Sequence, residues 1–294
     1  MSILKNINTE LRNPKSFSID QMTSHEAVSL MIEEEYSVIE ALKDQHNNIA
    51  EVIIHTSQTL KNGGRIVYIG AGTSGRLGIL DAVECPPTFS VDYNTIIGLI
   101  AGGEKAFVQA VEGAEDDPLL ADDDLKKIQL SNNDIVLGIA ASGRTPYVIG
   151  ALEYAKKIGA KTVAISCSKN AKISDYADFF IEAVPGPEVL TGSTRLKAGT
   201  TQKLILNMIS TLSMVSVGKV YQNLMVDVKP SNIKLVERAK RIICEATGVD
   251  YDIAQDIYQK ANNSVKIAIV MILNDCSYDE ALAILKKNNN FIKS

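Results

Sequence analysis

Hydrophobic residues between about residues 24 and 61 recur at the three- and four-residue intervals of an amphipathic helix. Ser24 is expected to cap this helical region, with Glu26 in its first turn. Asn62-Gly63-Gly64 is expected to end it, because glycine adopts the left-handed backbone of a helix C-terminus without steric strain. The pattern predicts that the chain opens with a helical segment.

Short apolar runs alternate with helical stretches in the middle of the chain. The runs are rich in β-branched residues and show little alternation, which is typical of strands buried on both faces, and they cover 65–69, 95–100, 134–139, 161–166 and 178–183. Helical spacing lies between them at about 76–84, 104–114, 119–128 and 146–158. This order predicts an α/β fold with a parallel sheet flanked by helices.

The last third of the chain reads as helical. A long helix is expected from about Lys197 to Gln222, and Pro230 separates it from a final block with helical spacing at 251–261, 264–274 and 278–287. We expect this block to be structural or to form oligomers. The predicted domains are an N-terminal helical segment, a central domain that contains the sheet and a C-terminal helical module, over residues 1–54, 55–220 and 221–294.

Composition narrows the range of partners and compartments. A net charge of −5 and a pI near 5.4 argue against a nucleic-acid surface, while leaving room for a local cationic site for one small anion. The four cysteines form no CxxC pair and have no histidine cluster nearby, so they are expected to be reduced. The sequence shows neither a signal peptide nor a stretch of about 20 apolar residues. We therefore expect a cytoplasmic protein with no membrane partner.

Two loops repeat a Ser-Gly-Arg motif directly after predicted strands. One loop is Gly70–Arg76 and the other is Ala140–Thr145, and each opens a predicted helix. The first N–H groups of a helix lack internal partners and carry partial positive charge, so they attract anions. Hydroxyl groups add hydrogen-bond donors for phosphate oxygens at Thr73, Ser74, Ser142 and Thr145.

The first loop also matches the dinucleotide fingerprint G-x-G-x-x-G. That fingerprint requires an acidic residue at the end of the second strand, but here Ala101-Gly102-Gly103 follows the strand and Glu104 comes too late. The loops therefore favour a phosphate monoester over a dinucleotide. Two tight strand–helix turns that bind no ligand remain an alternative.

Two carboxylates lie next to helix-breaking residues. Glu84 precedes Pro86 and Pro87, which are expected to stop its helix and hold Glu84 on a stiff corner. Glu115 lies in an acidic cluster between two predicted helices. Either side chain, taken alone, is also compatible with a solvated surface position.

Cations gather where the long helix is expected to begin, in the segment Gly192–Lys203. Arg195 and Lys197 oppose the positive end of a helix dipole, so we expect an anion to offset them.

Taken together, these motifs resemble the N-acetylmuramic acid 6-phosphate etherases of the sugar isomerase (SIS) superfamily. The resemblance covers nearly the whole chain and is most specific in Glu84-Cys85-Pro86-Pro87-Thr88-Phe89 and in the segment from Gly192 to Thr200. Thr201 departs from the alanine expected there. The resemblance implies a SIS-type sheet, N-terminal helices and a small C-terminal helical module.

The resemblance also implies a reaction. Members cleave the lactyl ether of N-acetylmuramate 6-phosphate with water, giving N-acetylglucosamine 6-phosphate and D-lactate by elimination and then hydration. Glu84 matches the proton donor and Glu115 the base. The residues expected to bind the phosphosugar are Gly72, Thr73, Ser74, Gly75, Ser142, Gly143, Arg144, Thr145, Arg195 and Lys197.

The resemblance implies no cofactor and no metal, a role in N-acetylmuramate catabolism, and a homodimer with active sites near the subunit interface. Two other functions stay open from the sequence. One is an aldose–ketose isomerase of the same superfamily, and the other is a non-catalytic sugar-phosphate sensor similar to the glucokinase regulatory proteins.

Overall fold

The computed structural model describes residues 8–228 and 233–293, which divide into two units. The first unit contains the described residues up to Val83 together with Asn94–Ser210. The second contains Glu84–Tyr93 and the described residues from Thr211 onwards. The predicted domain boundaries after residues 54 and 220 stay predictions.

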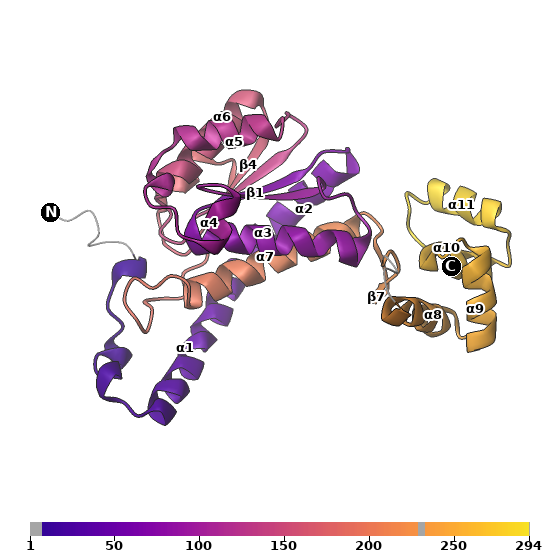
Figure 1. Ribbon diagram of the computed structural model, residues 1–294, viewed down its shortest axis with the longest axis horizontal. Helices are drawn as coiled ribbons and strands as arrows, with labels where there is room; N and C mark the ends of the chain where they lie inside the picture. The colour runs from indigo at the N-terminus through magenta and orange to yellow at the C-terminus, as the bar shows by residue number, and fades with distance from the viewer. Residues whose placement is uncertain (1–7, 229–232, 294) are drawn as a thin grey trace. The chain divides into compact units, whose positions relative to one another are not determined.

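Five parallel strands form the centre of the first unit (Figure 1). Their order in the sheet is β2-β1-β3-β4-β5, and their bounds are β1 (Ile66–Gly70), β2 (Ile96–Ile100), β3 (Ile135–Ile139), β4 (Lys161–Ser166) and β5 (Phe179–Glu182). All five predicted strands are confirmed. Every residue of β1 and β3 is buried, which explains why their sequences show no polar alternation.

Helix α6 (Pro146–Ile158) covers one face of the sheet and packs on β1, β3 and β4. A Cβ on Gly138 of β3 would lie 2.7 Å from Val148 of α6, so the glycine allows the helix to approach the strand closely. Helix α5 (Leu119–Lys127) packs against α6 on the same side (Figure 1). Both helices were predicted, and both are confirmed.

Helix α3 (Gly72–Phe89) covers the other face. A Cβ on Gly98 of β2 would lie 2.5 Å from the Cα atom of Ile79 in α3, so this contact also requires glycine. Helix α7 (Lys197–Ser216) lies beside α3 and hydrogen-bonds to its buried Asp81 (Figure 1). The sheet is therefore sandwiched between helices, as the strand–helix alternation predicts.

The N-terminal helical region consists of two helices, α1 (Ser24–Asp44) and α2 (His46–Lys61), separated at Gln45. The N-cap is Thr23 and not Ser24, because the Thr23 side chain forms a reciprocal capping box with Glu26. Helix α2 packs on β1 and β5.

Helix α3 runs through both of its prolines to Phe89. The prediction that Pro86 and Pro87 stop the helix after Glu84 is wrong. Each proline removes one helical hydrogen bond, but both lie near the end of α3, so the loss affects only its last turn. Burial of Cys85 and Phe89 holds this turn, and Ser90 N donates to Pro86 O at 3.0 Å.

Helix α4 (Glu104–Val108) is shorter than the predicted helix over 104–114. Gly113 has a φ of +76°, and a short 3-10 turn, Ala114–Asp116, follows it. Helix α4 already ends at Val108, where Gln109 has extended backbone, and the left-handed Gly113 could not belong to a continuous helix either. Glu115 lies on this turn between α4 and α5, so its predicted position between two helices is confirmed.

The second unit contains the end of α7, a two-stranded hairpin and a group of helices. Helix α7 ends at Ser216 and not at the predicted Gln222, because Gly218 adopts a φ of +79° and the hairpin begins. The elements that follow are β6 (Val220–Tyr221), β7 (Leu224–Met225), α8 (Ile233–Thr247), α9 (Tyr251–Lys260), α10 (Val265–Asn274) and α11 (Tyr278–Lys287). The three predicted helices are confirmed, α8 was not predicted, and Pro230 lies outside the described residues.

The helices of the second unit surround their own apolar core, to which Val226, directly after β7, contributes. Buried Lys266 of α10 donates to Gly218 O at 2.6 Å and to Asp227 at 2.7 Å, and so ties the hairpin to the helices. Among the described residues, no helix has the length and apolar character needed to cross a bilayer.

Candidate active site

The two Ser-Gly-Arg loops lie side by side at one edge of the sheet. Strands β1 and β3 are parallel neighbours, and their last residues, Gly70 and Ile139, are paired. The carboxyl ends of parallel strands meet at the same edge, which is where α/β folds place ligands. The structure thus brings together two loops that are far apart in the sequence.

In the first loop, α3 begins at Gly72 directly after β1. The leading N–H groups of α3, from Gly72 to Ser74, therefore have no helical partners and point out of the helix end. A Cβ on Gly75 would lie 2.7 Å from the carbonyl oxygen of Gly70, so this position requires glycine. The loop has the geometry of an anion-binding helix terminus.

In the second loop, Gly143 has a φ of +68°, and a Cβ there would lie 2.4 Å from that of Ala171. Thr145 is the N-cap of α6 but makes no side-chain capping bond. Within the described ranges, the side chains of Ser142, Arg144 and Thr145 form no hydrogen bond or ion pair with the protein. Their donors are available to a ligand.

Arg76 of the first loop differs from Arg144 in its hydrogen-bond partners. Its Nε donates to Phe107 O at 2.9 Å and its Nη2 donates to Ala106 O at 2.7 Å. The guanidinium group therefore holds α4 against α3. Sequence reasoning did not anticipate this difference between the two copies of the motif.

A pocket of about 210 Å³ opens beside the first loop. Its wall includes Gly72 and Arg76 from α3, and Glu112 and Glu115 from the segment after α4. Glu115 is exposed on its 3-10 turn. The structure thus places one of the two predicted catalytic carboxylates next to the helix terminus that is predicted to bind phosphate.

Glu84 belongs to the other unit. It is exposed near the end of α3, and its carbonyl oxygen accepts a hydrogen bond from Thr88 Oγ1 at 2.7 Å. Its role as proton donor stays a prediction.

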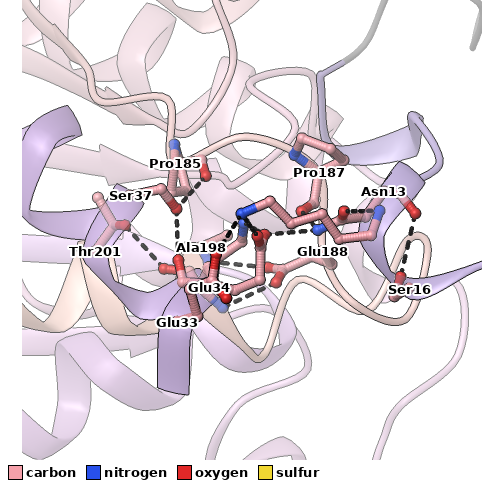
Figure 2. Close-up of polar contacts among 12 residues, drawn as sticks. Asn13, Ser16, Glu33, Glu34, Ser37, Pro185, Pro187, Glu188, Ala198 and Thr201 are labelled. Atoms are coloured by element: carbon pink, nitrogen blue, oxygen red, sulfur yellow. Dashed lines mark hydrogen bonds and ion pairs between the residues drawn. The ribbon is translucent and has the colours of Figure 1, made fainter. Parts of the chain in front are cut away.

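The N-terminus of α7 is capped by an acidic residue of the chain itself (Figure 2). The carboxylate of Glu188 accepts the backbone N–H groups of Lys197 and Ala198, each at 2.9 Å. Burial raises the pKa of Glu188, although these two hydrogen bonds act in the opposite direction. The cap satisfies donors that an external anion would otherwise bind.

Lys197 is buried and its Nζ pairs with Glu34 of α1 at 2.7 Å. Glu34 also accepts from Asn13 Nδ2 at 2.6 Å and pairs with Lys15 at 3.1 Å (Figure 2). Burial alone would raise the pKa of Glu34, but these partners outweigh it and hold the pKa below its ordinary value.

The anion expected beside Lys197 is thus present within the protein, as Glu34. A phosphate contact for Lys197 stays a prediction. Arg195, by contrast, is exposed and has no ion pair among the described residues. Asn13 near the N-terminus also belongs to this network, and nothing in the sequence indicated its partner.

Helix α7 also contacts the first loop. Ser74 Oγ donates to Gln202 Oε1 at 2.9 Å. A Cβ on Gly199 would lie 3.5 Å from the methyl group of Thr73, so the helix approaches the loop closely. The segment with the clustered cations therefore lies against the loop that is predicted to bind phosphate.

Comparison with known proteins identifies the relatives of this chain. A family model described as the glucokinase regulatory protein N-terminal SIS domain matches residues 48–156, and one described as the SIS domain matches residues 117–212. The N-acetylmuramic acid 6-phosphate etherase of Francisella philomiragia is 79% identical over the full length of both chains. The etherase of Bacillus cereus is 58% identical over 99% of both chains.

Among solved structures, two phosphoheptose isomerases share the fold. GmhA from Neisseria gonorrhoeae is 17% identical, with a TM-score of 0.50, and the match covers 65% of this chain and 98% of that chain. The phosphoheptose isomerase from Francisella tularensis is 19% identical, with the same TM-score and the same coverage. The predicted SIS-type fold is confirmed. At 58–79% identity over the whole length of its relatives, the chain belongs to the N-acetylmuramic acid 6-phosphate etherase family.

Proposed function

We propose that this enzyme cleaves the lactyl ether of N-acetylmuramate 6-phosphate with water, giving N-acetylglucosamine 6-phosphate and D-lactate. The observation that carries the proposal is the full-length identity of 58–79% to proteins named for this activity. The same identity favours an etherase over an isomerase or a sensor of the SIS superfamily. Its setting would be the cytoplasm, in the reuse of cell-wall sugars.

The two loops would hold the 6-phosphate group. The free N–H groups at the start of α3 and the available side chains of Ser142, Arg144 and Thr145 supply donors from adjacent strands. A phosphate dianion accepts hydrogen bonds at each of its terminal oxygens, so converging donors suit it. Arg195, which has no ion pair among the described residues, adds a positive charge just before α7.

The reaction requires one acid and one base. With the sugar in its open-chain form, the aldehyde acidifies the C2 proton, and a base removes it as the C3–O bond breaks. The departing lactate oxygen takes a proton from an acid, and water then adds to C3 of the unsaturated aldehyde. We assign Glu84 as the acid and Glu115 as the base, and each role accelerates such a reaction by about 10²–10⁴-fold.

The position of Glu115 supports its assignment. Glu115 lines the same pocket as Gly72, so a base on this turn would lie near a sugar whose phosphate binds the start of α3.

We also propose that the enzyme is a homodimer. Helix α1 leaves a stripe of apolar side chains, between 46% and 71% exposed, at Val28, Ile32, Tyr36 and Ile39. Their spacing of four, four and three residues places them on one face of the helix. A second copy of the chain would cover this face.

The proposed function is tested by incubating the protein with N-acetylmuramate 6-phosphate and assaying D-lactate. We expect lactate release by the wild type. E84Q should release at least about 100-fold less lactate, since it removes the acid, while it still binds N-acetylglucosamine 6-phosphate. E104Q changes an exposed glutamate at the start of α4 and serves as the control that keeps full activity.

Absence of lactate at high wild-type concentration would overturn the etherase proposal. Interconversion of an aldose phosphate and a ketose phosphate without lactate would favour the isomerase. Wild-type turnover by E84Q would refute the role of Glu84.

A further inference from the structure

A buried hydrogen bond joins α7 to the loop that is predicted to bind phosphate. Ser74 Oγ donates to Gln202 Oε1 at 2.9 Å, across 128 positions of sequence. Gln202 is fully buried and Ser74 is 6% exposed. The pair is therefore shielded from water, where the direction of a hydrogen bond matters most.

The other end of the Gln202 amide has no partner within the described ranges of the chain. Among the residues that the structure describes, no acceptor lies within hydrogen-bond distance of Gln202 Nε2. A buried amide nitrogen without an acceptor is costly and calls for an explanation. The amide oxygen and nitrogen have nearly the same shape, so a half-turn about the last side-chain bond exchanges them with little movement elsewhere.

The direction of this hydrogen bond decides what Ser74 offers a ligand. A serine hydroxyl has one proton to donate. In the observed arrangement that proton is donated to Gln202. The terminal oxygens of a phosphate dianion can only accept, so Ser74 in this state presents them with lone pairs and not with a donor.

We propose that Gln202 is a positioning residue whose side-chain amide turns over when a phosphate monoester binds. In the turned state Nε2 donates to Ser74 Oγ, and the serine proton is free to bind a phosphate oxygen. A side-chain amide can both accept from Ser74 and donate to it, whereas an ionised carboxylate only accepts and a thioether does neither strongly. The inference rests on the proposed function, because it assumes a phosphosugar at this loop.

The test measures the dissociation constant of N-acetylglucosamine 6-phosphate by calorimetry for the wild type, Q202E, Q202M and S74A, and for the double variants. In Q202E the Ser74 hydroxyl continues to donate its hydrogen bond to the introduced carboxylate and cannot donate to the phosphate. The dissociation constant should therefore rise about tenfold or more, as expected for the loss of one hydrogen bond to a charged group. Q202M leaves Ser74 unoriented and should have a smaller effect, of about threefold.

The S74A background separates hydrogen-bond direction from charge. In S74A, Q202E retains only the repulsion between its carboxylate and the phosphate, so its effect should shrink at least about fivefold relative to the effect in the wild type. Equal effects of Q202E with and without Ser74 would overturn the inference. N-acetylglucosamine without phosphate is the control ligand, and its binding should not distinguish Q202E from the wild type.

A pH series adds a readout that a purely structural role would not change. As the introduced carboxyl protonates on acidification, it gains a proton to donate to Ser74, so the ratio of Q202E to wild-type constants should fall between pH 7 and pH 5. A ratio independent of pH would contradict the proposal.

Thermal melts identify any variant that fails to fold. If Q202E does not fold, the double-mutant cycle of Q202M and S74A tests the inference instead. In that cycle Q202M should weaken binding only when Ser74 is present. If the wild type itself fails to bind the phosphosugar, the proposed function fails. If the wild type binds and the cycle shows no coupling, this inference alone fails.

Discussion

Buried Glu34 brings the N-terminal segment, α1 and the start of α7 together through single hydrogen bonds to Asn13 and Lys197. Its charge is compensated by Lys197, which is 3% exposed in its side chain. A buried pair of this kind adds little stability over a well-packed apolar pair, but removal of one partner leaves the other charge without compensation. The network makes these segments depend on each other.

The pKa of Glu34 provides the first prediction. Because its pKa in the folded chain is lower than its ordinary value of 4.5, its contribution to stability is present above that value and is lost as the pH falls through the lowered pKa. E34Q should reduce the free energy of unfolding at pH 7 by about 3 kcal/mol, since Lys197 loses its counter-charge. The loss should become smaller below pH 4.5, as measured by urea unfolding at several pH values.

E33Q is the matched control. Glu33 is adjacent and also pairs with Lys15, at 3.0 Å, but its side chain is 64% exposed. Exposed pairs contribute about 0–1 kcal/mol, so E33Q should change little. A loss in E34Q that stays constant from pH 7 to pH 3 would contradict the argument.

At the scale of single elements, the close approach of α3 to β2 depends on Gly98. G98A should lower the free energy of unfolding by roughly 1–3 kcal/mol or more, because its Cβ would lie 2.5 Å from the Cα atom of Ile79 and backbone would have to move. Urea unfolding measures the change.

Gly63 offers a comparison without crowding. It has a φ of +77°, and in the described part of the chain no atom apart from those of its chain neighbours lies within 4 Å of a Cβ placed there. G63A therefore tests backbone strain alone, which costs about 1 kcal/mol. Equal losses in G98A and G63A would show that crowding at Gly98 is relieved at little cost.

The elements themselves could be predicted from the sequence to a large extent. Strands β1 and β3 are uniformly apolar and β-branched, and α6 has helical spacing between Pro146 and a C-terminal Gly159, so local patterns determine both. Local rules failed where packing overrides propensity. Helix α3 continues through Pro86 and Pro87, and α8 was missed although Ala239, Ile242 and Ile243 mark its buried face.

The candidate site was only half predictable. The two loops carry a visible motif, and strand order brings them together. The partners of its polar groups are remote, because Lys197 pairs with a residue 163 positions away and Ser74 with one 128 positions away. No local pattern contains that information, since the register between distant segments is set by the tertiary fold.

At the scale of the whole molecule, the apolar stripe on α1 predicts the oligomeric state. The wild type should have the mass of a dimer by light scattering after gel filtration. I32E combined with Y36E should yield monomers, because charges on this face would be buried without partners in the interface.

I54E is the control, since Ile54 is 66% exposed on α2 and lies outside the stripe. It should leave the dimer intact. A dimer that survives the double substitution would mean that another surface joins the subunits.

Arg76 and Arg144 occupy the same position in the two copies of the motif but have different surroundings. Two copies of one motif follow adjacent strands, yet the guanidinium group of Arg76 is occupied by the carbonyl oxygens of Ala106 and Phe107, whereas Arg144 keeps its donors free within the described residues. The two copies of the motif therefore have different roles. One copy holds α4 against α3 and so supports the wall of the pocket, while the other presents a half-buried cation, so exchanging the two loops in a chimera would not restore the original protein.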